Sequence, residues 1–312
     1  MSKPSLWAVR LIVLGAFAAT VWLCGPRAAA VLAAKLDGAS RPGPRVALDR
    51  VGFAERPDWL DQPLLVAVAE AVSPWLSDEV GILDEATARR VRDGLETVPW
   101  VCEASIERLF PDRFRVQLAL RRPVLAVRSG DDDPLCLVDK DGVVLPWVDT
   151  PLPVLRLYRE GGSPTMSIVP GEASAEARVR VAAAIACEWR DELAPLVDGC
   201  PALDEIDATN LGERWIRGPE YPEVRVTLVR HDGAPVVFGY GRPVDSPMPR
   251  VPVRSKAHVL QQILGRHPGL DGLVAGDLRF VRRWADYLQP RAPGVRDPNG
   301  PWKELVPVPA GR

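Results

Sequence analysis

Apolar residues are concentrated near the amino terminus, in the run LIVLGAFAATVWLC at residues 11–24. A helix over this run and its apolar flanks would be about 30 Å long, which is the thickness of the hydrocarbon core of a bilayer. Lys3 and Arg10 precede the run and no acidic residue does. This flank predicts that the short tail stays inside and the bulk of the chain lies outside. We therefore expect a cytoplasmic tail at 1–10 and a transmembrane helix at 11–27.

The same run also fits a cleaved signal peptide, because it is short and the small residues Ala28-Ala29-Ala30 follow it. In both cases the remaining chain is exported across the cytoplasmic membrane. Residues 28–44 contain the stretch LDGASRPGP, whose prolines and glycines predict a linker before the first folded module.

A pattern of short extended and helical segments begins at Arg45. A brief apolar run there predicts a strand, and Asp61 is a favourable N-cap for a helix. The apolar positions of that helix recur at the spacing of one helical face, at Leu65, Val68, Ala69, Val72 and Leu76. A second helix follows the cap residue Asp84, with an apolar stripe at Ala88, Val91, Leu95 and Val98.

Two strands complete this first module. Residues 104–109 alternate loosely, and residues 114–120 alternate between apolar and polar side chains, which is typical of a strand with one solvated face. The predicted order is strand, helix, helix, strand, strand, with the two helices covering one face of a three-stranded sheet. Residues 45–124 are therefore expected to form a small α+β domain.

Residues 125–288 are richer in strand patterns. Two pairs of apolar runs flank turn sequences and predict β-hairpins, 135–138 with 143–145 around DKDG and 224–228 with 236–238 around HDGA. Helices are expected at 173–193 and 255–266, and a strand at 277–280. Residues 289–312 contain six prolines and are predicted to be disordered. The whole chain is thus expected to be α+β, with a mixed, β-rich second domain that also holds helices.

Several short motifs stand in order along the chain, namely Pro99-Trp100-Val101, Arg121-Arg122-Pro123, Leu137-Val138-Asp139-Lys140-Asp141-Gly142 and Asp277-Leu278-Arg279-Phe280. Because this ordered set of motifs follows a single predicted membrane anchor, the chain resembles the FtsQ/DivIB family of bacterial cell-division proteins. The resemblance implies a single-pass inner-membrane protein with its amino terminus in the cytoplasm. It implies a POTRA domain at 45–124 and a β domain at 125–288, both in the periplasm. It also implies a non-enzymatic scaffold at the division septum that binds other divisome proteins, among them FtsB-like and FtsL-like coiled-coil subunits.

The closing segment of the β domain is where the resemblance places partner binding. A partner segment would add there as a further strand, because an edge strand offers unpaired N–H and C=O groups. The residues expected to take part are Arg279, Phe280, Arg282, Arg283, Trp284 and Tyr287. Their aromatic rings would anchor the partner, and the arginines would meet its acidic residues. The alternative is that Phe280 and Trp284 close the core and that the arginines are solvated.

Catalytic and metal-binding patterns are weak in this sequence. His231, His258 and His267 have no nucleophile motif near them. The run Asp131-Asp132-Asp133 is followed by Pro134, and no carboxylate stands where a calcium loop requires one. A net charge of −2 does not favour nucleic acid as the main partner. We expect no catalytic residue, no metal, no cofactor and no small-molecule substrate.

The cysteines and the other function classes leave alternatives open. Cys187 and Cys200 lie close in sequence and are the favoured disulfide pair for an oxidising compartment. Unpaired buried thiols are the alternative. Beside the division scaffold, two function classes remain. One is a POTRA-containing envelope assembly protein that is not tied to division, and the other is an envelope hydrolase.

Overall fold

The computed structural model describes residues 45–47, 57–76, 79–81, 85–109, 113–130, 132–157, 168–212, 222–241 and 250–290. The chain divides into two compact units. The first takes the amino terminus to residue 53 with 73–94 and 104–117, and the second takes 54–72, 95–103 and 118–312. Within the described ranges, no helix combines the length and the apolar character needed to cross a bilayer. The predicted transmembrane segment and linker lie outside these ranges.

The amino-terminal half contains six elements, β1 (Arg45–Ala47), α2 (Gln62–Leu76), β2 (Glu79–Gly81), α3 (Glu85–Glu96), β3 (Val101–Leu109) and β4 (Arg113–Leu120). β1 pairs with β2, and β3 pairs with β4 in a separate two-stranded sheet. The expected order lacked β2, and the expected three-stranded sheet is two pairs in the described part of the chain. A strand of three residues is too short to show a period of two in the sequence.

The two predicted helices of this half are confirmed, with one shift of face. Asp61 accepts a hydrogen bond from the Leu64 backbone N–H at 3.0 Å and so caps α2. The buried stripe of α2 begins at Leu64, which is 2% exposed, whereas the predicted Leu65 is half-buried. The remaining predicted positions of both helices are buried except Ala69.

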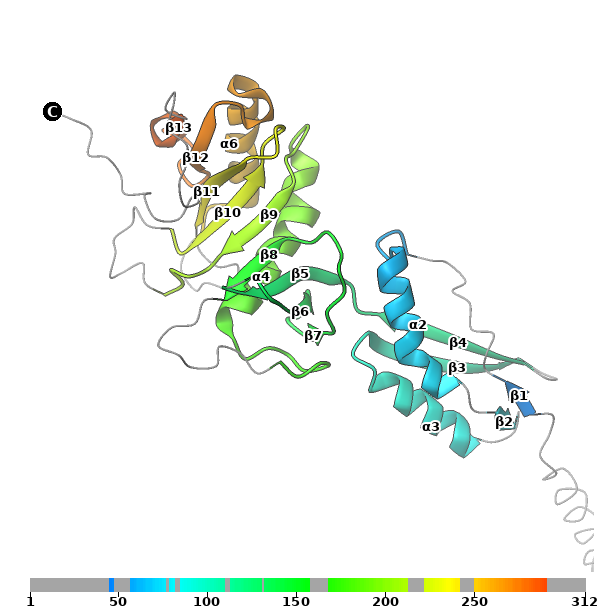
Figure 1. Cartoon of the computed structure of the whole chain (residues 1–312). Helices are drawn as coiled ribbons and strands as arrows, with labels where there is room; N and C mark the ends of the chain where they lie inside the picture. The colour runs from blue at the N-terminus through cyan, green and yellow to red at the C-terminus, as the bar shows by residue number, and fades with distance from the viewer. Residues whose placement is uncertain are drawn as a thin grey trace, which may run out of the picture. The chain divides into compact units, whose positions relative to one another are not determined.

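A nine-stranded mixed sheet dominates the second unit (Figure 1). Its strands are β5 (Pro123–Ser129), β6 (Pro134–Asp139), β7 (Val144–Leu145), β8 (Val154–Leu157), β9 (Leu203–Asp207), β10 (Val224–Val229), β11 (Pro235–Gly241), β12 (Leu273–Asp277) and β13 (Gln289–Pro290). Their order across the sheet is β13-β12-β11-β10-β9-β8-β5-β6-β7. The pairs β5–β8, β8–β9 and β11–β12 are parallel, and the others are antiparallel. The chain is therefore α+β, as expected.

Most of the predicted elements of this unit are present. Both hairpins form, β6 with β7 and β10 with β11, and glycine takes a positive φ in each turn, 78° at Gly142 and 82° at Gly233. The predicted helices correspond to α4 (Ala177–Glu188), which continues as a π-helix at Trp189–Leu193, and to α6 (Val253–Arg266). Both helices pack on the sheet in one core (Figure 1).

The closing segment differs from the prediction. A strand was expected at 277–280, but β12 ends at Asp277. The chain then turns and forms a short 3₁₀-helix at Trp284–Tyr287. Gln289 and Pro290, which the proline content assigned to a disordered tail, form β13. The rest of that predicted tail, 291–312, lies outside the described residues.

A buried charged cluster joins α4, β11 and α6. The Glu188 carboxylate accepts hydrogen bonds from Tyr240 Oη at 2.5 Å, from Lys256 Nζ at 3.0 Å and from Arg250. The Lys256 ammonium also lies 3.5 Å from the centre of the Tyr240 ring. Burial raises the pKa of Glu188, but Lys256, Tyr240 and Arg250 together bring that pKa below its ordinary value. The cluster therefore holds an ionised carboxylate in the core.

Candidate partner-binding edge of the large sheet

One edge of the nine-stranded sheet, at β7, is closed by the chain itself. The segment 171–174 runs beside β7 and exchanges backbone hydrogen bonds with it. The Val144 N–H donates to Glu172 O at 2.9 Å, and the Gly171 N–H donates to Val144 O at 2.8 Å. A further bridge joins Val143 to Ala173. The backbone groups of Val144 are thus already paired, and β7 offers little to a partner strand.

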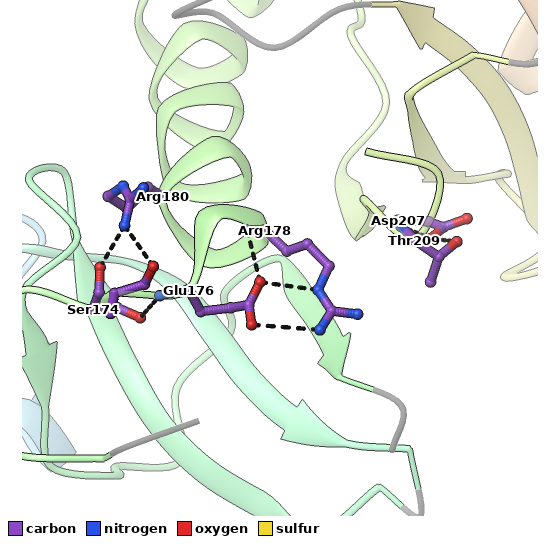
Figure 2. A network of polar contacts seen from close by, with 7 residues as sticks. Ser174, Glu176, Arg178, Arg180, Asp207 and Thr209 are labelled. Atoms are coloured by element: carbon purple, nitrogen blue, oxygen red, sulfur yellow. Dashed lines mark hydrogen bonds and ion pairs between the residues drawn. The ribbon is translucent and has the colours of Figure 1, made fainter. Parts of the chain in front are cut away.

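The first turn of α4 holds this covering segment in place (Figure 2). Arg180 donates from one guanidinium nitrogen to the carbonyl oxygens of Ser174 and Ala175, both at 2.9 Å. The Glu176 N–H donates to Ser174 Oγ at 3.2 Å, and the Glu176 carboxylate accepts from the Arg178 N–H as the cap of the helix. The closed edge is therefore fixed to a helix of the core.

The other edge of the sheet is at β12, where the described residues that cover it are Gln289 and Pro290. β12 pairs in parallel with β11 on its inner side. On its outer side, within the described residues, it pairs with β13 alone, Leu273 opposite Pro290 and Ala275 opposite Gln289. The register shifts between these two pairs, so Val274 lies in a bulge. Pro290 has no backbone N–H to donate. Within the described residues, β12 therefore has outer positions for which no strand partner is seen.

The end of β12 folds back on itself through a carboxylate–guanidinium clamp. Asp277 accepts hydrogen bonds from the Arg279 backbone N–H at 2.9 Å, from Nε at 2.9 Å and from Nη2 at 2.7 Å. The clamp lies against the backbone of β11, where a Cβ added at Gly239 would come within 2.6 Å of Asp277 Oδ2. Glycine at this position therefore makes room for the clamp and fixes the direction of the chain after β12.

The six residues predicted to bind a partner lie together, but none is in a strand. Arg279 is held by Asp277, and the Phe280 and Tyr287 rings stack with centroids 3.9 Å apart and planes 7° apart. Arg282 and Arg283 are exposed, and Arg283 pairs with Asp286 at 2.8 Å. Tyr287 is exposed. The closing segment was expected to form the edge to which a partner strand adds, but residues 279–287 are a turn and a 3₁₀-helix, and the edge strands of this part of the sheet are β12 and β13.

Trp284 belongs to the core, as the alternative interpretation held. It is 8% exposed and part of the main apolar cluster. The Arg266 guanidinium of α6 lies 4.6 Å from the centre of its ring. Trp284 therefore fastens the 3₁₀-helix to α6 and leaves Tyr287 as the aromatic residue that faces solvent.

The surface at this edge is apolar and locally basic. Val274, Val281 and Tyr287 are among the large apolar side chains that remain exposed. The exposed charged side chains of the closing segment are Arg282, Arg283 and Asp286, which is one more basic than acidic, although the whole chain has a net charge of −2. We call Val274, Val281, Tyr287 and the outer side of β12 the edge surface. Sequence reasoning missed Val274 and Val281, because apolar content alone does not distinguish a bulged, exposed valine from its buried neighbours.

The predicted disulfide is not formed in the structure. Cys187 and Cys200 are both free and half-buried, Cys136 is free and buried, and Cys102 is free and exposed. Burial raises the pKa of Cys136 to about 12 and that of Cys200 to about 11. These thiols act as small apolar residues of the core rather than as reactive groups.

Neither a metal site nor a match to a known protein provides a further indication of function for the described residues. Among the residues that the structure describes, no group of three or more His, Cys, Asp or Glu side chains is arranged to hold a metal ion. A scan against known protein families and a search of curated proteins both find no match for this chain. The edge surface is therefore the feature from which function is inferred.

Proposed function

We propose that this chain is a membrane-anchored scaffold of the FtsQ/DivIB type that binds other division proteins outside the cytoplasm. Its partners in this proposal are the FtsB-like and FtsL-like coiled-coil subunits of the divisome. The short amino-terminal tail stays in the cytoplasm, and residues 11–27 form the single membrane-spanning helix. Residues 45–124 act as a POTRA domain and residues 125–288 as the β domain at the septum. The ordered motifs in the sequence support this assignment.

Binding takes place by strand addition at the carboxyl-terminal edge of the large sheet. The observation that carries this step is the contrast between the two edges. β7 is paired with a segment fixed to α4, whereas in the described part of the chain β13 covers two residues of β12. A partner strand gains backbone hydrogen bonds only where such groups are unpaired. Among the described residues, β12 has five residues, of which Leu273 and Ala275 pair with β13, and we take it as the strand to which the partner adds.

The side chains around β12 define the chemistry of the partner segment. Val274 and Tyr287 are exposed apolar groups next to the edge, and they suit an extended segment with apolar residues on one face. Exposed Arg282 and Arg283 lie in the same closing segment and favour acidic residues at its rim. The partner segment is therefore expected to be extended, partly apolar and acidic. Such a segment fits the flexible end of a small coiled-coil subunit.

The test is affinity purification of the full chain from membranes, with identification of the bound proteins. Wild-type chain is expected to recover septal division subunits. Val274→Asp places a charge in the apolar part of the edge surface and is expected to reduce recovery at least tenfold, which corresponds to about 1.4 kcal/mol.

Val169→Asp is the matched control. Val169 is 41% exposed and Val274 is 39% exposed, but Val169 lies just before the segment that closes the opposite edge. Recovery with Val169→Asp is expected to equal that of the wild type. Equal losses in both variants would argue against the edge at β12, and reproducible absence of division subunits would overturn the scaffold assignment.

A further inference from the structure

β13 is a weakly attached strand. It has two residues, both exposed, and one of them is a proline that cannot donate a backbone hydrogen bond. Its register against β12 includes a bulge at Val274. Shortness, proline and a bulge are each devices by which proteins protect an edge strand from unwanted pairing. β13 therefore covers β12 while contributing little to the stability of the fold.

The attachment of the closing segment does not depend on β13. Trp284 is buried in the core and Leu288 packs against the same apolar cluster. A Cβ at Gly276 would lie 3.1 Å from Leu288 Cδ2, so Leu288 rests on the backbone of β12 itself. The anchored part of the segment thus ends at Leu288. Gln289 and Pro290 can leave β12 without the loss of any buried side chain.

A partner strand cannot gain much by adding outside β13. Such a strand would meet two residues and, because of Pro290, at most one N–H donor. β12 has five residues, from Leu273 to Asp277, and would offer a much longer ladder if its outer side were open. Strand addition of useful length at this edge therefore requires that β13 moves away.

We propose that β13 is a displaceable guard, which occupies the outer side of β12 in the free protein and is exchanged for the partner strand on binding. This inference rests on the proposed function, because it concerns the same edge. In the free protein the guard keeps β12 from pairing with other copies or other chains. Because only molecules whose guard is displaced can bind, the apparent affinity is the intrinsic affinity multiplied by the fraction of such molecules.

Gln289→Pro tests the guard with little disturbance of its surroundings. The substitution removes the remaining backbone N–H of β13, so neither residue can donate to β12. Leu288 has φ −79° and ψ 132°, an extended conformation that a following proline accepts. Gln289→Ala is the matched control, because it removes the same side chain and keeps the N–H.

Binding is measured with the full-length chain in detergent, with the FtsB-like subunit as the probe. Gln289→Pro is expected to bind about three- to tenfold more tightly than the wild type, since the cost of displacing the guard is removed. Gln289→Ala is expected to stay within about twofold of the wild type. Equal or weaker binding by Gln289→Pro would overturn the guard, because β13 would then be part of the template.

Hydrogen exchange gives a second and independent readout. On binding, the amides of β12 are expected to gain protection while the Gln289 amide loses it. Retained protection at Gln289 would mean that the partner adds outside β13 and would refute the exchange. If neither the wild type nor Gln289→Pro binds the subunit, the proposed function itself fails. By contrast, equal binding of the subunit by the wild type and Gln289→Pro would refute the guard and leave the proposed function standing.

Discussion

Burial separates the four cysteines that the structure describes into one accessible thiol and three protected ones. Cys102 is exposed, whereas burial raises the pKa of Cys136, Cys187 and Cys200. Thiolate is the reactive form, so a raised pKa and restricted access both slow the reaction of a buried cysteine. The oxidising compartment expected for the exported chain does not require these thiols to pair.

Thiol labelling checks this assignment residue by residue. In the native full-length chain at about pH 7.5, a maleimide is expected to modify Cys102 at least tenfold faster than the other three, as followed by peptide mass spectrometry. After denaturation without reductant, all four are expected to react. Modification of Cys187 and Cys200 that requires prior reduction would show a disulfide and contradict the free thiols.

Residue identity alone decided few of the roles at the edge surface. The sequence offers Trp284 and Tyr287 as aromatic anchors, with a core position as the alternative for Trp284, and the structure buries Trp284 and leaves Tyr287 exposed. The difference depends on Arg266 and the apolar cluster, which meet Trp284 from a helix distant in sequence. Such contacts are not visible in local patterns. The sequence therefore predicted a segment whose residues lie together, but it could not assign which of its side chains are buried.

At the scale of elements, prediction succeeded where the determinant is local. The two hairpins follow from turns that need a positive φ at Gly142 and Gly233, and α2 and α3 follow from apolar periodicity. Prediction failed for β2, β13 and the end of β12. β2 and β13 have two or three residues, which is too few to show a period, and they form by pairing with β1 and β12. The end of β12 is set by the Asp277–Arg279 clamp over Gly239.

The Glu188 cluster joins α4 and α6 to β11, and its removal is expected to weaken the fold. Glu188→Gln leaves the ammonium of Lys256, which is 1% exposed, without its counter-charge. The free energy of unfolding is expected to fall by about 3–5 kcal/mol, as measured by urea denaturation near neutral pH. Glu192→Gln, an exposed position one helical turn further on, removes a more distant negative charge and keeps the Glu188 pairs, so it is the comparison and is expected to cost much less.

The same cluster sets a dependence on pH. Because the pKa of Glu188 is lowered in the folded state, its contribution to stability is present above the unfolded value of 4.5 and is lost as the pH falls through the folded value. The difference in stability between wild type and Glu188→Gln is therefore expected to narrow when urea unfolding is repeated at about pH 3. A difference that is constant between the two pH values would contradict an ionised, paired Glu188.

At the scale of the whole molecule, the proposed function requires that the edge surface is delivered to the outer side of a membrane and kept there. We predict that residues 11–27 remain attached and anchor the chain. The full-length protein is then expected to stay in the membrane pellet after alkaline washing and to keep its full mass.

Val13→Arg places a charge in the apolar run and is expected to reduce insertion, since arginine at a helix centre costs about 2.5–3.5 kcal/mol. Val31→Arg, outside the run, is the matched control. A soluble exported product shortened by about 30 residues would instead indicate cleavage near Ala30. A scaffold that has to hold membrane-bound subunits at one place would then have lost its tether.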